Sequence, residues 1–273
     1  MRVGRIGAGL ALAVALAGCG TAGASGQSVA DKDTLTIGVS KDQPGLGFRK
    51  SDGTFEGFDI DVARYLGAHM EKKPKKVDFK VVQYSDRESS VQTGKVDLVI
   101  SSYSITPERK TKVAFAGPYY VAHQDTLVRT SDAGIHNVRD LAGRRLCAVN
   151  GSVSWQRVTK ERGVHASLVQ AATYGDCLTK LTSNALDAIS TDDLILAGFA
   201  AQKGRSVRFV NAPISDERYG VGIAQGDVTG CEDINKAITE MYLDGTATKL
   251  LKKWFGPTGL NLTTTVPQFE GCG

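Results

Sequence analysis

The sequence predicts an α/β fold in which one strand–helix–strand arrangement occurs twice. Short β-rich runs alternate with stretches of helical periodicity in residues 35–101, and the same alternation returns in residues 145–191. Alternating strands and helices are typical of βαβ crossovers. About 240 residues follow position 33, which is enough for one large domain or two smaller ones with proper cores.

The first series opens with a strand over residues 35–40 and a helix over residues 58–70. Apolar residues recur at helical spacing in that helix, so we expect Phe58 and Tyr65 to face a core. The series then continues with a strand, a helix and a strand, over residues 77–83, 87–93 and 96–101.

The second series begins after Tyr119 with an extended run over residues 125–129. Its expected strands cover residues 145–149, 166–170 and 188–191. Its expected helices start at Ser152, at Tyr174 and after residue 191. The last elements are a strand and two amphipathic helices, over residues 219–224, 233–243 and 246–255. We place these two helices back on the first unit, followed by a tail without periodicity.

Residues 1–18 have the pattern of an export signal, because Arg2 and Arg5 precede an apolar run that is too short to span a bilayer. The run ends in Leu-Ala-Gly-Cys, which resembles the lipobox of bacterial lipoproteins and predicts that Cys19 is lipidated. Residues 19–33 are small and polar, as in a flexible tether. We therefore expect an exported protein held by its lipid at the outer face of the cytoplasmic membrane.

The charge balance gives no reason to expect a nucleic-acid partner. The chain has 33 basic and 29 acidic residues, and removal of the signal leaves 31 basic against 29 acidic ones. Four cysteines remain besides Cys19, an even number that favours two disulfides in an exported chain. The sequence has neither a CxxC motif nor paired histidines at ligand spacing, so we expect no metal and no cofactor.

Several motifs resemble family 3 of the bacterial extracellular solute-binding proteins. In the first half they are GFDID, GKVDLVIS, SITPER and PYY, at residues 57–61, 94–101, 104–109 and 118–120. In the second half they are LAG, VNGS and the run from LDA to Asp192, at residues 141–143, 149–152 and 186–192. The segment KDQPGLG at residues 41–47 and the positions of the cysteines resemble the glutamate-binding lipoproteins of high-GC Gram-positive bacteria.

This resemblance implies a periplasmic-binding-protein-like fold of type II, with two α/β lobes joined by a two-segment hinge. We expect lobe 1, lobe 2, the return to lobe 1 and the tail at residues 34–122, 123–215, 216–255 and 256–273. Three pairings of the cysteines are possible from the sequence. We favour Cys147 with Cys177 and Cys231 with Cys272, because each pair joins nearby elements in this fold.

An amino-acid ligand needs partners for its carboxylate and its ammonium group. By family position Arg109 is the carboxylate clamp, on a helix that Thr106 caps. Ser102 and Ser104 follow a strand at the edge where open α/β sheets bind ligands, although serines also form turns there. From lobe 2, the backbone N–H groups at Gly151 and Ser152, with the Ser152 hydroxyl, would meet the same carboxylate.

Asp192 matches the family position that pairs with the ammonium group; Asp193 is its rival, and either aspartate could simply cap a helix. A second ligand carboxylate would need a second cation. We expect Arg87, ahead of Lys41, to provide it. Gln43 and Tyr219 are weaker candidates at the cleft mouth.

The resemblance implies a receptor that captures glutamate, or else aspartate, and delivers it to the permease of an ABC importer. The sequence shows no signal for oligomer formation, so we expect a monomer. A receptor for glutamine or another polar amino acid, and a sensory lipoprotein of the same fold, remain alternatives. A dehydratase-like enzyme is less favoured, because the four histidines are scattered and neither GxSxG nor HExxH occurs. We interpret Asp59 and Asp61 as helix-start charges rather than an acid/base pair.

Overall fold

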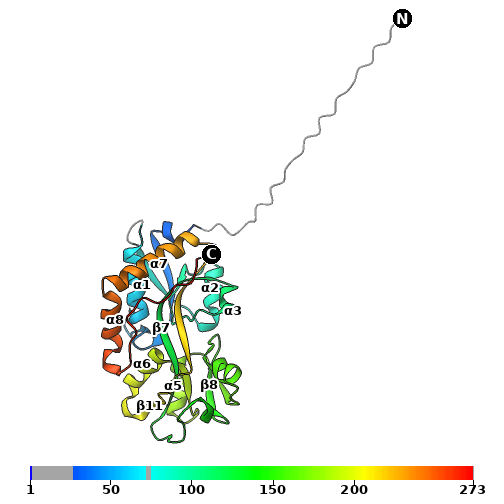
Figure 1. Cartoon of the computed structure of the whole chain (residues 1–273), viewed down its shortest axis with the longest axis vertical. Coiled ribbons are helices and arrows are strands. Elements are labelled where there is room, and N and C mark those ends of the chain that lie inside the picture. The colour runs from blue at the N-terminus through cyan, green and yellow to red at the C-terminus, as the bar shows by residue number, and fades with distance from the viewer. Residues whose placement is uncertain (2–26, 72–74, 273) are drawn as a thin grey trace.

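The computed structural model describes Met1, residues 27–71 and residues 75–272. Cys19, nearly all of the expected signal peptide and most of the expected tether lie outside the described residues. Two lobes stack along the long axis of the molecule, and long strands run between them (Figure 1).

The main sheet has seven strands in the order β10-β7-β12-β6-β1-β5, with β11 paired to β7. Its strands are β1 Thr34–Val39, β5 Lys76–Val81, β6 Leu98–Val99, β7 Ala114–Arg129, β10 Ile189–Asp192, β11 Val207–Phe209 and β12 Ser215–Ile223. Strand β1 pairs in parallel with β5 and β6, as the βαβ pattern predicts, while β7 and β12 are antiparallel.

Lobe 1 surrounds strands β1, β5 and β6. Its helices are α1 Phe58–His69, α2 Arg87–Gln92, α3 Pro107–Lys110, α7 Val228–Leu243 and α8 Thr246–Phe255. A small sheet, β2-β3-β4, consists of Asp42–Gln43, Gly47–Arg49 and Phe55–Glu56. Phe58 is fully buried and Tyr65 nearly so, which confirms that this face of α1 packs on the core.

Lobe 2 contains the parallel pair β8 Arg145–Val149 and β9 Ser167–Ala171. Its helices are α4 Ser154–Gln156, a π-helical turn Arg157–Glu161, α5 Tyr174–Thr182 and α6 Asp193–Lys203. The remaining elements are short 3₁₀ helices at Val29–Asp31, Tyr84–Asp86, Val138–Leu141, Gly204–Ser206 and Gly256–Thr258.

Strands β7 and β12 form the two crossings between the lobes (Figure 1). Near lobe 1, Ala114 pairs with Ile223, and near lobe 2, Gln124 pairs with Ser215. Their register shifts between Tyr219 and Val221, so the ladder is irregular midway along. The expected hinge of two extended segments is therefore present as two paired strands of one sheet.

Both ends of the described chain pack on lobe 1. The Val29–Asp31 turn is held by Asp227, which accepts from the Ser28 hydroxyl at 2.6 Å and the Val29 N–H at 2.9 Å. Val29 and Ala30 are buried, so packing begins a few residues before position 34. At the other end, Cys272 forms a disulfide with Cys231 in α7.

The C-terminal tail crosses the hinge strands. The Glu270 N–H donates to the Gly117 carbonyl on β7 at 2.8 Å, and the Glu270 carboxylate pairs with Arg218 on β12. Lys110 reaches the same carboxylate at 2.7 Å. The segment that lacks periodicity in the sequence is thus fastened to both crossing strands.

Several expected boundaries differ from those observed. Helix α7 starts five residues before the expected position 233, because the Asp227 side chain accepts from the Gly230 N–H and caps it. The strand expected at 125–129 starts at Ala114. The helix expected from Ser152 is one turn of α helix followed by a π turn.

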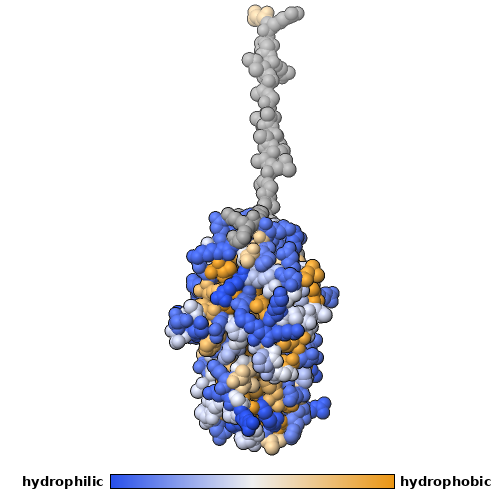
Figure 2. Space-filling model, turned by 90° about the vertical axis from the view of Figure 1, so that its left-hand side faces the viewer, coloured by the Kyte–Doolittle hydropathy of each residue, from blue (hydrophilic) through white to orange (hydrophobic). Residues whose placement is uncertain are grey.

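Searching the described residues finds no helix with the length and apolarity that a membrane crossing requires. Hydrophilic residues cover much of the face drawn in Figure 2, with hydrophobic ones in small groups between them.

Candidate functional site

The polar and charged side chains that could bind a ligand meet between the lobes, around a small cavity of about 10 Å³. Lobe 1 and lobe 2 each provide one wall. The lining residues are Tyr84, Arg87, Ser102, Ser104, Arg109, Ser152, Val153, Ser154, Tyr174, Thr191, Asp192 and Ile195.

Arg109 is placed by the short helix α3, whose cap is Thr106 as the sequence predicts, since the Thr106 hydroxyl accepts from the Arg109 N–H at 3.2 Å. The guanidinium donates to the Ser104 carbonyl at 2.6 Å and to the Gly151 carbonyl at 2.9 Å. Glu88 lies 3.4 Å from Nε. Burial, followed by the nearby charge of Arg87, lowers the pKa of Arg109 to about 10.

Arg87 is the first residue of α2 and is only 1% exposed. Its guanidinium donates to three backbone carbonyls: Tyr84 at 3.2 Å, Ser101 at 3.2 Å and Gly151 at 3.0 Å. Within the part of the chain that the structure describes, no carboxylate forms an ion pair with it. A buried cation that contacts only neutral acceptors has capacity left for an anion.

Gly151 brings lobe 2 against both arginines. Its φ of +80° is the left-handed conformation that glycine tolerates best. A Cβ at this position would come within 2.5 Å of Ser85 N and the Tyr84 carbonyl carbon. Glycine therefore lets the turn approach lobe 1 closely enough for its carbonyl to accept from two guanidinium groups.

Asp192 ends strand β10 and precedes helix α6. Its side chain makes no capping bond to that helix; it accepts from the Tyr219 hydroxyl at 2.7 Å. Burial raises the pKa of the Asp192 carboxyl well above its usual range, and the nearby charge of Glu217 adds to the shift. The interpretation as a helix cap does not hold for this side chain, which faces the cavity.

Asp193 lies beside Asp192 in the chain but does not line the cavity. Its carboxylate accepts from the Leu194 N–H at 2.8 Å, and burial raises its pKa to about 6. Of the two rival aspartates, the structure brings Asp192 to the site.

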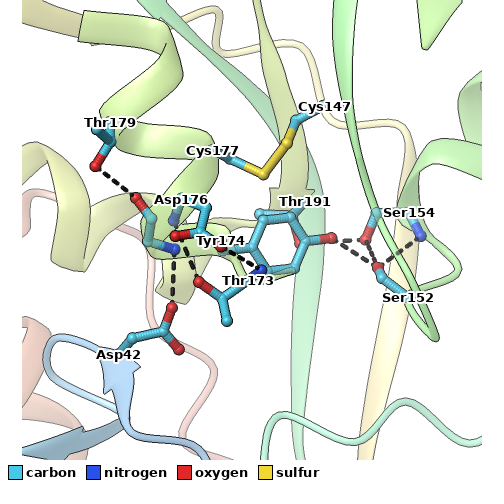
Figure 3. The surroundings of a disulfide bond; sticks show 11 residues. Asp42, Cys147, Ser152, Ser154, Thr173, Tyr174, Asp176, Cys177, Thr179 and Thr191 are labelled. Atoms are coloured by element: carbon cyan, nitrogen blue, oxygen red, sulfur yellow. Dashed lines mark hydrogen bonds between the residues drawn. A yellow bond between two sulfur atoms is a disulfide. The ribbon is translucent and has the colours of Figure 1, made fainter. Parts of the chain in front are cut away.

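Lobe 2 lines the cavity with hydroxyl groups (Figure 3). The Tyr174 and Ser152 hydroxyls lie 2.7 Å apart, and Ser154 is 3.1 Å from Thr191. Ser152 also accepts from the Ser154 N–H at 3.2 Å. These groups can donate to or accept from a polar ligand.

The opposite wall holds Ser102 beneath Gln43. The Gln43 amide contacts the Tyr84 hydroxyl and lies 2.9 Å from the Ser102 hydroxyl, so Gln43 supports the wall rather than lining it. Asp59 lies behind, where it accepts from the Ser102 N–H and the Tyr119 hydroxyl, both at 2.8 Å. Burial raises the pKa of Asp59 to about 6. Asp59 lies in the first turn of α1, as expected for a helix-start charge, and it is fully buried there.

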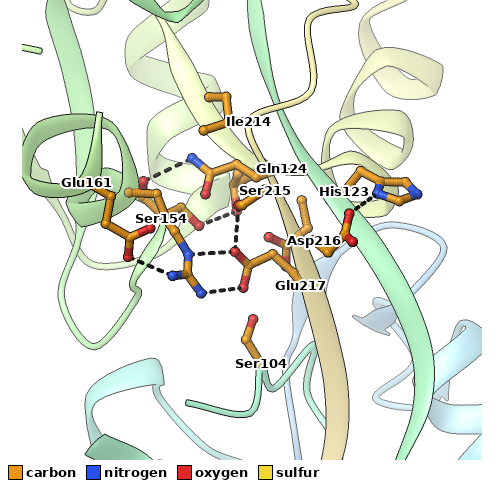
Figure 4. A network of polar contacts seen from close by, with 12 residues as sticks. Ser104, His123, Gln124, Ser154, Glu161, Ile214, Ser215, Asp216 and Glu217 are labelled. Carbon is orange, nitrogen blue, oxygen red and sulfur yellow. Dashed lines mark hydrogen bonds and ion pairs between the residues drawn. The ribbon is translucent and has the colours of Figure 1, made fainter. Parts of the chain in front are cut away.

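A polar network fixes lobe 2 to the hinge strands below the site (Figure 4). Arg157 donates to the buried Glu217 of β12 at 2.8 Å. Gln124 of β7 donates to the Ser154 carbonyl at 2.9 Å and to the Ser190 hydroxyl at 2.8 Å. These contacts hold the serine-containing turn at a defined place beside the crossing strands.

The structure therefore brings together most of the residues singled out from the sequence. Those that line the cavity are Arg87, Ser102, Ser104, Arg109, Ser152 and Asp192. Gln43 and Tyr219 form a second layer. Lys41 is exposed and is not among the lining residues. The described residues include no group of acidic, histidine or cysteine side chains that could hold a metal ion.

Four further lining residues are not evident from the sequence as ligand-binding residues: Tyr84, Tyr174, Ser154 and Thr191. Tyr84 and Tyr174 come from different lobes and meet edge to face, with ring centroids 5.5 Å apart. Nothing in the sequence separates these tyrosines from core ones. Thr191 precedes Asp192 on β10, so its position beside the predicted ligand residue was the available signal.

The model of the bacterial extracellular solute-binding proteins, family 3, matches residues 35–257. The chain belongs to this family. The expected type II fold, two α/β lobes on a two-segment hinge, is thereby confirmed. Residues 35–257 include every cavity-lining residue, so the site lies within the part shared with the other members of family 3.

Several members of family 3 are similar over most of their length. Glutamate-binding protein GluB of Corynebacterium glutamicum is 36% identical over 269 residues, which cover 93% of this chain and 90% of GluB. The ABC transporter glutamine-binding protein GlnH of Bacillus subtilis is 32% identical over 254 residues, which cover 88% of this chain and 92% of GlnH.

Among solved structures, an ancestral arginine-binding protein bound to arginine is similar with a TM-score of 0.75 and 33% identity, covering 82% of this chain and 99% of that one. These relatives bind different amino acids. Family 3 membership therefore supports amino-acid binding, and the charges in the cavity have to indicate which kind.

Proposed function

We propose that this protein is the substrate-binding component of an ABC importer for an acidic amino acid, with glutamate the leading ligand and aspartate next. The observation that carries the proposal is the pair of buried cations, Arg87 and Arg109, that line one cavity with Asp192. The carboxylate and ammonium groups common to all amino acids would pair with Arg109 and Asp192. Arg87 then leaves one positive charge for a side-chain carboxylate.

The Gly151 carbonyl supports this assignment, because an oxygen atom already lies within 3.0 Å of Arg87 and 2.9 Å of Arg109. A ligand carboxylate that displaced this carbonyl oxygen would bring a full negative charge to the same donors. The hydroxyls of Ser152 and Tyr174 line the same cavity from lobe 2 and can donate to a ligand carboxylate. Ligand bridging both walls would select the closed arrangement of the lobes, which the permease subunits would recognise.

Delivery requires the protein to stay near its importer. The export pattern at residues 1–18 and the lipobox at Cys19 support a chain tethered by lipid to the outer face of the cytoplasmic membrane, and we propose that it acts as a monomer without a cofactor. Replacement of Cys19 by Ser is expected to release the exported chain into the medium. Continued fractionation with the membrane after this change would contradict lipid anchoring.

Calorimetric titration of the released Cys19→Ser chain tests the ligand. The chain would be unfolded and refolded to remove carried-over ligand, then titrated with glutamate, aspartate, glutamine and arginine. We expect tight binding of glutamate, alone or with aspartate. A preference for glutamine, as in the name of GlnH, would keep the receptor role and overturn the acidic specificity. Chemical conversion of an added ligand by the purified chain would instead indicate an enzyme.

Uptake separates delivery from sensing. Cells that lack the gene should import radiolabelled glutamate more slowly and recover with the intact gene. Normal uptake, combined with glutamate binding by the purified chain, would favour the sensory alternative.

A further inference from the structure

The segment from Asp42 to Pro44 of lobe 1, which comprises β2 and the residue after it, contacts lobe 2 outside the cavity. Asp42, in β2, accepts a hydrogen bond from the backbone N–H of Gly175 at 2.9 Å through Oδ2. Its other oxygen accepts from the Ser40 hydroxyl at 3.2 Å, which orients the carboxylate. Figure 3 shows Asp42 directed at the first turn of α5, the helix that carries Tyr174 and Cys177.

The bond has a clear physical basis. Gly175 is the second residue of a nine-residue helix, and N–H groups of a first turn have no acceptor within their own helix. The Thr173 side chain caps a different group, the Asp176 N–H. A carboxylate opposite the positive end of a helix accepts a charge-assisted hydrogen bond. Asp42 therefore caps the N-terminus of α5 although it belongs to the other lobe.

A second contact lies beside the first. The Pro44 carbonyl oxygen packs so closely on α6 that a Cβ at Gly198 would overlap it. A Cβ at Gly175 would come within 2.7 Å of Asp42 Oδ2. Glycine inside a helix weakens it relative to alanine, so two helical glycines at the two contacts indicate that close approach of this segment is required.

These contacts are separate from the ligand cavity, because neither Asp42 nor Pro44 lines it. On lobe 2 the contact point is rigid: Cys177, two residues after Gly175, forms a disulfide with Cys147 of β8. The hydrogen bond between Asp42 and Gly175 of α5 therefore connects the two lobes directly, at a place outside the ligand cavity.

We propose that Asp42 is a positioning residue whose bond to Gly175 latches the lobes together, setting the closed population and hence the affinity for every ligand without affecting selectivity. The inference rests on the proposed capture of an amino acid between the lobes. A ligand that binds the closed form has an apparent affinity proportional to the fraction of chains that are closed.

Asp42→Ala is the direct test because it removes the acceptor oxygens, with Asp52→Ala as a matched control because Asp52 is an exposed carboxylate in the same small sheet region of lobe 1. For Asp42→Ala we expect the Kd for glutamate and for glutamine to rise by the same factor, about tenfold, mainly through faster dissociation. Asp52→Ala should bind as the unmodified chain does. A changed glutamate-to-glutamine ratio would overturn the inference, because it would mean that Asp42 contacts the ligand.

A double-mutant cycle checks the partner. Gly175→Ala should weaken binding of both ligands, because its methyl group would meet the Asp42 carboxylate. In a chain that already carries Asp42→Ala, the same change should add little. Additive losses would show that Gly175→Ala acts on α5 itself and would contradict the latch.

Amide exchange provides a readout without ligand. In the unliganded chain the Gly175 N–H should exchange faster after Asp42→Ala, which removes its acceptor, than after Asp52→Ala. If the unmodified chain binds no amino acid, the proposed function fails and this comparison alone decides on the latch. The latch proposal would be overturned if the Gly175 N–H exchanged at the same rate in the two variants and, where a ligand binds, both variants had the same Kd.

Discussion

Arg87 and Arg109 donate to the same oxygen atom, the carbonyl of Gly151, from two different helices of lobe 1. Both guanidinium groups also lie over one ring, with their Cζ atoms 4.4 and 4.8 Å from the centroid of Tyr103. Two like charges held this close repel each other, and the nearby Arg87 is one reason why the pKa of Arg109 falls to about 10. An anion between them relieves that repulsion, which is the physical basis for expecting a carboxylate-rich ligand.

Loss of Arg109 should abolish binding of every amino acid. We expect Arg109→Ala to raise the Kd for glutamate, aspartate and glutamine by about 30-fold or more, since removing one partner of a buried charge pair costs about 2–5 kcal/mol. Titration calorimetry measures the loss, and circular dichroism checks the fold. Arg139→Ala, at an exposed arginine of lobe 2, is the control. Retained binding would remove Arg109 from the site.

Loss of the Arg87 charge should change selectivity. Arg87→Gln keeps a donor but removes the cation, so the Kd for glutamate should rise at least 30-fold, while that for glutamine changes by less than about fivefold. Competition titration with the two ligands measures the ratio. Lys41→Gln is the matched control: Lys41 is exposed, so its replacement should leave glutamate binding within about twofold. Equal losses of both ligands in Arg87→Gln would contradict the assignment.

The buried Asp59 should make stability depend on pH. Its pKa rises from 3.8 to about 6 on folding, so between these values the native state holds a proton that the unfolded chain has lost. Stability from this group is present below pH 4 and is lost as the pH rises through 6. Asp59→Asn, in which the side-chain oxygen can still accept from Ser102, should reduce this decline by up to about 3 kcal/mol between pH 4 and 7.

Urea unfolding at several pH values measures this effect. Some decline should persist, because burial also raises the pKa of Asp193 to about 6. Asp78→Asn, at an exposed carboxylate of β5, should leave the profile unchanged. Parallel profiles for Asp59→Asn and the unmodified chain would show that Asp59 titrates normally.

The disulfide between Cys231 and Cys272 should contribute to global stability. It spans 41 residues, for which the chain-entropy model gives about 4 kcal/mol. Replacement of both cysteines by serine should lower the free energy of unfolding by that order and detach residues 256–272 from the hinge. Thermal unfolding and limited proteolysis of the tail measure the two effects; unchanged values in both would mean that the bridge adds nothing to packing.

The sequence predicted the fold class and the presence of Arg109 and Asp192 in the cavity better than it predicted the remaining lining residues. Arg109 and Asp192 could be located because family motifs fix them at the ends of regular elements. Lys41 could not be judged, since its neighbour Gln43 turns inward while Lys41 itself is exposed. The tyrosines Tyr84 and Tyr174 meet only because the lobes are closed, and periodicity carries no information about such long-range contact.

Strand β7 illustrates a second limit. Gly117 and Pro118 interrupt the strand pattern, so the sequence indicated only its last residues, although the strand runs from Ala114 to Arg129. Strand β12 pairs with β7 on both sides of the interruption, at Ala116 and at Tyr120. Tertiary hydrogen bonding therefore overrode a local signal that would ordinarily end a strand.

The chain enters and leaves lobe 1 through two neighbouring strands, and each disulfide has both of its cysteines in a single lobe. Lobe 2 is thus an insertion that carries its own covalent staple. Such an arrangement allows the two halves to change separately: a new lobe 2 joined at β7 and β12 would bring its own hydroxyl wall and Asp192 to an unaltered pair of arginines. The wall that faces the two arginines can therefore be exchanged as a module, by recombination at two adjacent points rather than by scattered substitutions.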